Sequence, residues 1–138
     1  MLNRIEGLLS KFSGVILFLA RVSVGIVFLN SGWYKFHNLE QTIGFFSSLG
    51  IPQPQLQVPF VAAVEFLGGI ALVIGFHARF VALPLIGVMT VAVLTAKLKE
   101  LTGVVAIAGL EEINFLLILA LIATSGPGVL AVSSRKRK

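Results

Sequence analysis

The stretch GVILFLARVSVGIVFLNSGW, residues 14–33, decides the fold of this chain. It is nearly all apolar and has the length of about 20 residues that an α-helix needs to cross the hydrocarbon core of a bilayer. Trp33 ends the stretch and Tyr34 follows it, and such aromatic residues are typical of a membrane–water interface. The stretch therefore predicts a membrane-spanning helix in which Arg21 and Asn30 are the polar exceptions.

The composition of the whole chain also indicates a membrane protein. Apolar residues make up 57% of the 138 residues, charged residues make up 12%, and the mean hydropathy is +0.98. An ordinary soluble domain has about 25% charged residues, so these values exclude a soluble globular domain, a disordered chain and a disulfide-stabilised secreted module. The absence of cysteine excludes thiol chemistry, and with only two histidines we expect no metal site.

Further apolar stretches predict three more membrane helices, at about residues 59–76, 80–96 and 104–125. The predicted fold class is therefore all-α, an integral membrane four-helix bundle with residues 1–138 as a single membrane domain. Residues 1–13 predict a short helix that lies in the interface before the first span. The connection at about residues 35–58 is expected to pack on or dip into the interface, and Pro52 and Pro54 exclude a continuous helix through it.

Four spans place both termini and the turn at residues 77–79 on one side of the membrane. Seven basic residues fall on this side, namely Arg4, Lys11, Arg79 and residues 135–138, whereas the other side has three, namely Lys35, Lys97 and Lys99. Because basic residues favour the cytoplasmic side, we expect both termini in the cytoplasm, with residues 129–138 as a basic tail. Much of the net charge of +5 lies in this tail, which indicates anionic lipid headgroups or a topology signal and no nucleic-acid partner.

A faint internal repeat relates the two halves of the chain. In the first and third spans a glycine precedes the closing lysine by ten positions, and each following span carries a glutamate in its outer half. The residues are Gly25, Lys35 and Glu65 in the first half and Gly87, Lys97 and Glu112 in the second. Two interpretations stay open: a duplicated helical hairpin, or coincidence, because glycine is common in membrane helices.

Arg21 and Glu65 are ionisable residues inside predicted spans, where a charge at the bilayer centre costs about 2.5–3.5 kcal/mol. Their distances from the predicted span ends, at 1.5 Å per residue, place them at levels that differ by roughly 10 Å. Arg21 shares one helical face with Gly25, Gly32 and Lys35. We therefore expect Arg21 and Glu65 to be electrostatically coupled, directly or through water. Two roles stay open for this pair: it takes part in the function of the protein, or it is a structural pair that fixes the register of the two helices.

A second polar cluster is predicted at the outer boundary of the membrane. Its members are Trp33, Tyr34, Lys35, Lys97, Glu112 and Asn114, which lie near the ends of the first, third and fourth spans. Cationic donors, a carboxylate and aromatic walls suit a quinone or another flat lipid-soluble ligand. The alternative is structural: Lys35 and Lys97 extend to water from span ends, and Glu112 lies at a helix start, where the helix dipole favours an anion.

Six short motifs, taken in order, resemble the DoxX family. They are RVSVGIVFLNSGWYKF at residues 21–36, FFSSLGIP at 45–52, EFLGG at 65–69, the G-x-x-x-R turn from Gly75 to Arg79, Glu112 before a long apolar run, and SGPG at 125–128. The resemblance covers about residues 20–128. It is carried by the order and spacing of the motifs, since each motif alone is weak.

This resemblance implies a four-helix protein of the bacterial inner membrane. Some relatives are the small subunit of a thiosulfate:quinone oxidoreductase, and others are linked to oxidative-stress complexes. The chain departs from the family at Lys97, where many relatives have a histidine, and its lack of cysteine excludes the thiol-bearing redox relatives. The resemblance therefore implies the fold and the location more than the reaction.

The first functional hypothesis is a quinone-interacting or accessory subunit of a membrane oxidoreductase. Lys35 or Lys97 would hydrogen-bond a quinone carbonyl, and Glu65 or Glu112 would exchange the accompanying proton. The candidate catalytic residues are Glu65 and Lys35, and the candidate ligand-binding residues are Arg21, Trp33, Tyr34, Lys97, Glu112 and Asn114. No flavin or metal motif occurs in the sequence, so electrons would come from a partner or from the substrate, and we expect no covalently bound cofactor.

The second hypothesis is a non-catalytic membrane module for structure or assembly. Such a module binds lipid, a partner protein or further copies of the chain, and it needs only the bundle, the closely packing glycines and the basic tail. Whether the chain is an enzyme stays open between these two hypotheses. At most it is a membrane subunit of a quinone-linked oxidoreductase, as in the first hypothesis. Small-solute transport is a poorer third option, because four spans are few for alternating access.

Overall fold

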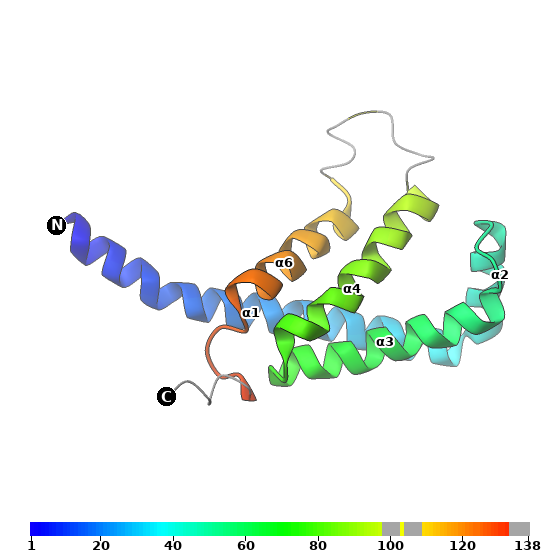
Figure 1. Ribbon diagram of the computed structural model, residues 1–138, viewed down its shortest axis with the longest axis horizontal. Coiled ribbons are helices and arrows are strands. Elements are labelled where there is room, and N and C mark those ends of the chain that lie inside the picture. Colours follow the sequence, from blue (N-terminus) through cyan, green and yellow to red (C-terminus); the bar gives the residue numbers. More distant parts are fainter. Residues whose placement is uncertain (98–102, 104–108, 133–138) are drawn as a thin grey trace.

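The computed structural model describes residues 1–97, 103 and 109–132, and this part of the chain is helical with no strand (Figure 1). In chain order the elements are α1 (Leu2–His37), α2 (Leu39–Ser48), α3 (Pro54–Ile74), α4 (Ala78–Ala92), a π-helical segment η1 (Val93–Lys97) and α6 (Glu111–Ser125). The all-α prediction is confirmed.

Within the described residues, three helices are long and apolar enough to cross a membrane, judged by length and composition: α1, α3 and the continuous helix Ala78–Lys97. The chain is therefore a multi-pass membrane protein. Helix α6 covers the second part of the predicted fourth span, and residues 104–108 of that span lie outside the described residues. The count of four spans stays a prediction.

Helix α1 is longer than the sequence analysis predicts. A separate interfacial helix for residues 1–13 is wrong, because α1 runs from Leu2 to His37 without a break. No proline occurs near the expected junction, and Gly14 costs only about 1 kcal/mol inside a helix. At about 1.5 Å per residue the helix is roughly 54 Å long, so its N-terminal turns project beyond the other helices (Figure 1).

The connection after α1 contains a helix that the sequence analysis does not predict. Helix α2 packs against α3 and ends at Ser48. Pro52 and Pro54 separate α2 from α3, as predicted. Helix α3 begins at Pro54 rather than at residue 59, because a proline is tolerated in the first helical turn, where its missing N–H has no partner within the helix.

Glycines let α1 and α3 pack side by side at very short distance (Figure 1). A Cβ atom on Gly32 would lie 2.5 Å from the backbone nitrogen of Phe66, and one on Gly25 would lie 3.0 Å from the carbonyl oxygen of Gly69. Backbones this close are typical of small-residue contacts between membrane helices. These contacts fix the register of α1 against α3, which run in opposite directions.

Helices α4 and α6 form a second pair that packs against the first (Figure 1). The buried core between the pairs is Val24, Phe28, Leu72, Ala78, Ala82, Leu85, Leu119 and Ile122. Gly68 of α3 contributes by accepting the side chain of Leu85 against its backbone. The main pairings, α1 with α3 and α4 with α6, are therefore pairings between successive long helices of the described chain.

The glycine contact between α1 and α3 makes the fold sensitive to a single methyl group. We expect Gly32→Ala to lower the free energy of unfolding by about 1–3 kcal/mol, because backbone cannot move away as a flexible side chain does. Gly87→Ala in α4 is the matched control, since no atom lies within 4 Å of its added Cβ. Thermal unfolding in detergent, followed by circular dichroism, measures both. Equal melting temperatures for the two variants would contradict the proposed register.

Candidate functional site

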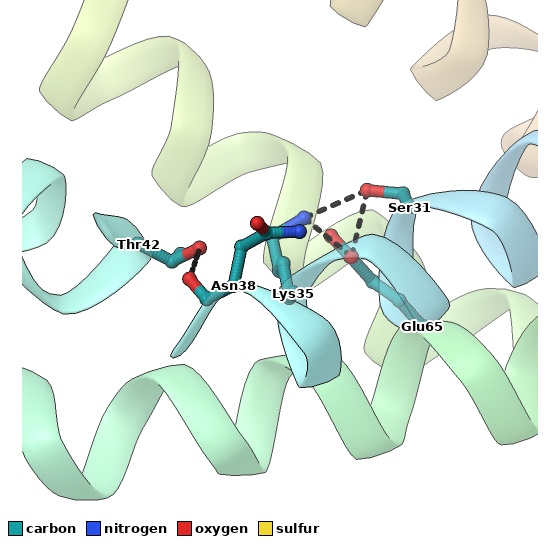
Figure 2. A network of polar contacts seen from close by, with 5 residues as sticks. All are labelled: Ser31, Lys35, Asn38, Thr42 and Glu65. Carbon is teal, nitrogen blue, oxygen red and sulfur yellow. Dashed lines mark hydrogen bonds and ion pairs between the residues drawn. The ribbon is translucent and has the colours of Figure 1, made fainter. Parts of the chain in front are cut away.

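Lys35, Ser31 and Glu65 form a closed hydrogen-bonded network between α1 and α3 (Figure 2). The Nζ of Lys35 lies 2.6 Å from the Oε2 of Glu65 and donates to the Oγ of Ser31 at 2.7 Å. The Ser31 hydroxyl in turn donates to the same Oε2 at 2.9 Å. The side chain of Glu65 is 3% exposed and that of Lys35 is 18% exposed. The network is therefore a nearly buried ion pair supported by a hydroxyl.

The register between the two helices explains why these residues meet. Gly32 lies against Phe66, so Glu65 is level with this part of α1. Ser31 and Lys35 are four residues apart in α1 and so share a face of that helix. The sequence analysis names Lys35 and Glu65 as candidates, but it misses Ser31. Ser31 could have been predicted from its position four residues before Lys35, which places both residues on one face of the helix.

The predicted coupling of Arg21 with Glu65 is wrong. The carboxylate of Glu65 binds Ser31 and Lys35, which lie ten and fourteen residues beyond Arg21 in α1. At about 1.5 Å per residue the axial separation is roughly 15–21 Å. The prediction took the depth of each residue from expected span ends, whereas α1 and α3 both begin earlier and their glycines set the register.

Arg21 instead holds the segment that follows α6 against α1. Its guanidinium is fully buried and donates to the carbonyl oxygens of Pro127 at 2.7 Å and Leu130 at 3.3 Å. The backbone N–H of Val129 donates to the carbonyl oxygen of Gly14 at 3.3 Å. Arg21 therefore has a structural contact in this fold, away from the Lys35–Glu65 pair.

A second ion pair joins the end of η1 to the start of α6. The Nζ of Lys97 lies 3.8 Å from the Oε1 of Glu112, and their side chains are 39% and 24% exposed. The lysine and the glutamate of each half of the faint repeat thus form an ion pair, one nearly buried and one near the surface. The prediction of one outer cluster that contains Lys35, Lys97 and Glu112 is wrong in this respect, because Lys35 pairs with Glu65 instead. The greater distance and exposure make the second pair the weaker one.

Between the two ion pairs lies a cleft of about 130 Å³. Its lining residues are Val27, Phe28, Ser31, Met89, Glu111, Glu112 and Phe115. Ser31 belongs to the first network and Glu112 to the second ion pair. The rings of Phe28 and Phe115 lie with centroids 6.2 Å apart. The cleft therefore combines aromatic and aliphatic walls with three polar side chains.

Other members of the predicted outer cluster lie elsewhere. Trp33 is exposed and packs its ring on His37 and Phe66, at centroid distances of 4.2 and 6.0 Å. Tyr34 is exposed and its hydroxyl donates to Gln41. Asn114 is exposed on α6 and is not among the residues that line the cleft. The expected aromatic entrance of Trp33 and Tyr34 is therefore wrong.

The aromatic residues that do line the cleft are Phe28 and Phe115. None of the four cleft residues Phe28, Phe115, Met89 and Glu111 is among the predicted site residues. Glu111 could have been predicted from its position next to Glu112. Met89 and Phe115 could not, because they reach the cleft through the packing of α4 and α6 against α1, which only the structure shows.

The fold and the site define a multi-pass, all-helical membrane protein with a small, mostly apolar cleft between its helices. The DoxX family model matches residues 16–98. The chain is 38% identical over 120 residues, covering 83% of this chain and 81% of the relative, to the Bacillus subtilis protein named "Putative oxidoreductase CatD". This chain belongs to the DoxX family.

Two similar proteins from Escherichia coli carry inner-membrane names. Inner membrane protein YqjF is 26% identical over 124 residues, which cover 90% of this chain and 94% of YqjF. Inner membrane protein YphA is 29% identical over 128 residues, which cover 88% of this chain and 90% of YphA. No solved structure matches the chain. These names support a membrane location and leave the reaction open.

The buried ion pair makes the stability of the fold depend on Lys35 and Glu65 together. We expect Lys35→Met to lower the free energy of unfolding by about 3 kcal/mol, because it leaves a carboxylate in the interior without its cation. The double variant Lys35→Met/Glu65→Leu should recover most of this loss. Lys97→Met is the control and should cost less than about 1 kcal/mol, because its pair is partly exposed. Chemical denaturation in detergent micelles measures these three variants and Glu65→Leu alone, and additive losses at Lys35 and Glu65 would contradict the pairing.

The contacts of Arg21 make a separate prediction for the C-terminal segment. Arg21→Met removes two charged hydrogen bonds, each worth about 1.5–3 kcal/mol, so we expect the backbone amides of residues 128–131 to exchange hydrogen at least tenfold faster. Arg4→Met, at an exposed position of the same helix, is the control. Hydrogen–deuterium exchange with mass spectrometry measures the effect. Unchanged exchange in Arg21→Met would show that the segment is held by other contacts.

Proposed function

We propose that this DoxX family protein binds a quinone-type ring in the cleft and serves as a quinone-interacting or accessory subunit of a bacterial inner-membrane oxidoreductase system. The observation that carries the proposal is the cleft itself, in which aromatic walls and polar side chains converge. Apolar walls with a few polar groups are the general character of small-molecule sites. The oxidoreductase name of the Bacillus subtilis relative agrees with the proposal.

The size of the cleft favours a single ring over a large ligand. Its volume of about 130 Å³ is well below the roughly 300–1,000 Å³ of drug-sized pockets. The rings of Phe28 and Phe115 contact each other, with centroids 6.2 Å apart, so a ligand ring would lie against them rather than between them. An apolar tail would leave along lipid-facing side chains. Val27 is suited to this exit, because it lines the cleft and is also 43% exposed.

The polar residues would bind and move protons. Glu112 and Glu111 line the cleft directly and can accept a proton from a ligand hydroxyl. Glu65 and Lys35 stand behind Ser31, one hydrogen bond from the cleft, and would exchange protons through its hydroxyl. Lys97 would hold the side chain of Glu112 through its ion pair. Because the chain has no cysteine for thiol redox chemistry, electrons would come from a partner subunit or from the substrate.

The membrane arrangement in this proposal has four spans and both termini in the cytoplasm. Helix α6 would form part of the fourth span beside α4, its packing partner. The Lys35–Glu65 and Lys97–Glu112 pairs would then lie in the outer half of the membrane, one in each helical hairpin. Basic residues at positions 4, 11 and 79 would face the cytoplasm, together with residues 135–138 of the basic tail at 129–138. Residues 133–138 of this tail lie outside the described residues.

A non-catalytic accessory role is the second candidate, favoured by the N-terminal turns of α1. These turns project beyond the other helices (Figure 1), and Leu8, Leu9 and Phe12 on them are exposed. Apolar side chains on a projecting helix suit lipid or a helix of a partner protein. This candidate needs no ligand in the cleft, so cleft occupancy distinguishes the two functions.

Filling the cleft tests the proposed function. We expect the full-length protein in nanodiscs to bind decylubiquinone or decylubiquinol, and Val27→Trp to weaken binding at least tenfold because the indole occupies the ring position. Ile26→Trp is the matched control, because Ile26 is exposed on the same helix and does not line the cleft. Titration calorimetry measures the affinities. No binding of either form, or equal loss in both variants, would contradict the proposal.

A further inference from the structure

The acidic residues of the cleft, Glu111 and Glu112, lie where a negative charge is favoured. Glu111 and Glu112 occupy the first turn of α6, where the helix dipole favours negative charge. Glu112 also has the ammonium group of Lys97 at 3.8 Å. An ionised carboxylate has no hydrogen to donate and only accepts hydrogen bonds. This end of the cleft therefore offers acceptors.

Ser31 also presents an acceptor to the cleft, because its hydrogen is already used. Its hydroxyl donates to the Oε2 of Glu65 at 2.9 Å. One lone pair of Ser31 accepts from the Nζ of Lys35 at 2.7 Å. A hydroxyl has one hydrogen and two lone pairs, so what remains for a ligand is the second lone pair.

Among the residues that the structure describes, the two lysines nearest the cleft donate to other groups. Lys35 donates to Ser31 and Glu65, and Lys97 pairs with Glu112. Neither lysine is among the residues that line the cleft. The three polar side chains in the described lining of the cleft, Ser31, Glu111 and Glu112, thus all accept hydrogen bonds.

From this arrangement we infer that the cleft binds the reduced, dihydroxy form of its ring ligand in preference to the oxidised, dicarbonyl form. The inference rests on the proposed function and specifies its ligand. A hydroquinone carries two O–H donors that complement acceptors on both sides of the cleft. A quinone carries two carbonyl oxygens, which would face carboxylates without a hydrogen between them. An unpaired acceptor facing another acceptor loses affinity.

The size of the preference can be stated as a ratio of dissociation constants. We expect the hydroquinone to bind at least tenfold more tightly than the matching quinone. Tighter binding of the reduced form makes reduction of the bound ligand more favourable. A tenfold ratio raises the midpoint potential of the bound two-electron couple by about 30 mV relative to the free couple.

The test compares two redox forms of one ligand on the unmodified protein. Full-length protein in nanodiscs is titrated under anaerobic conditions with decylubiquinol and decylubiquinone. The dimethyl ether of decylubiquinol serves as a third probe, which keeps the ring and removes both O–H donors. We expect the hydroquinone to bind at least tenfold more tightly than the quinone, and the ether to bind no more tightly than the quinone.

Variants assign the preference to the carboxylates. Glu111→Gln/Glu112→Gln introduces amides that can donate, so the ratio should fall to about one. Glu40→Gln, at an exposed acidic position in α2, should leave the ratio unchanged. Equal affinity for both forms, tighter binding of the quinone, or a ratio unaffected by the double variant would overturn the inference and leave the proposed function in place. Failure of both forms to bind would overturn the proposed function as well.

Discussion

The close packing of α1 on α3 at glycines is the constraint on which the rest of the structure depends. Gly25 and Gly32 meet the backbone of α3 directly, so the two helices cannot slide without a backbone clash. This fixed register brings Glu65 to Ser31 and Lys35. A carboxylate inside the membrane-spanning part of the protein is thereby paired and hydrogen-bonded, which such a charge requires.

The second helix pair, α4 and α6, completes the cleft beside α1. Helices α4 and α6 pack against α1 and α3 and bring Met89 and Phe115 to the face of α1 that carries Phe28 and Ser31. The start of α6 adds two carboxylates to the same cleft. Two lysine–glutamate ion pairs therefore flank one small space, with Ser31 as the residue that belongs to both the cleft and the buried ion pair.

The sequence alone predicted the helical class, the family and most of the charged candidates. An apolar run in a bilayer must satisfy its own backbone hydrogen bonds, which a helix does. A charged residue inside such a run needs a partner and so stands out as a candidate. It was insufficient for pairing, because register depends on which glycine of one helix meets which backbone of the other. Arg21 was therefore assigned to Glu65, although it binds the carbonyl oxygens of Pro127 and Leu130. For the same reason Phe115 was not predicted as a site residue, since it reaches the cleft only because α6 packs beside α4 and α1.

The central claim is the register of α1 against α3, and site-directed cross-linking tests it most directly because the native chain has no cysteine. Two cysteines are introduced at a time and treated with a short bifunctional thiol reagent in membranes. The account predicts efficient cross-linking of Trp33→Cys with Phe66→Cys, whose native rings lie 6.0 Å apart, and none of Val22→Cys with Phe66→Cys. Cross-linking of the second pair and not the first would place Arg21 beside Glu65 and contradict the account.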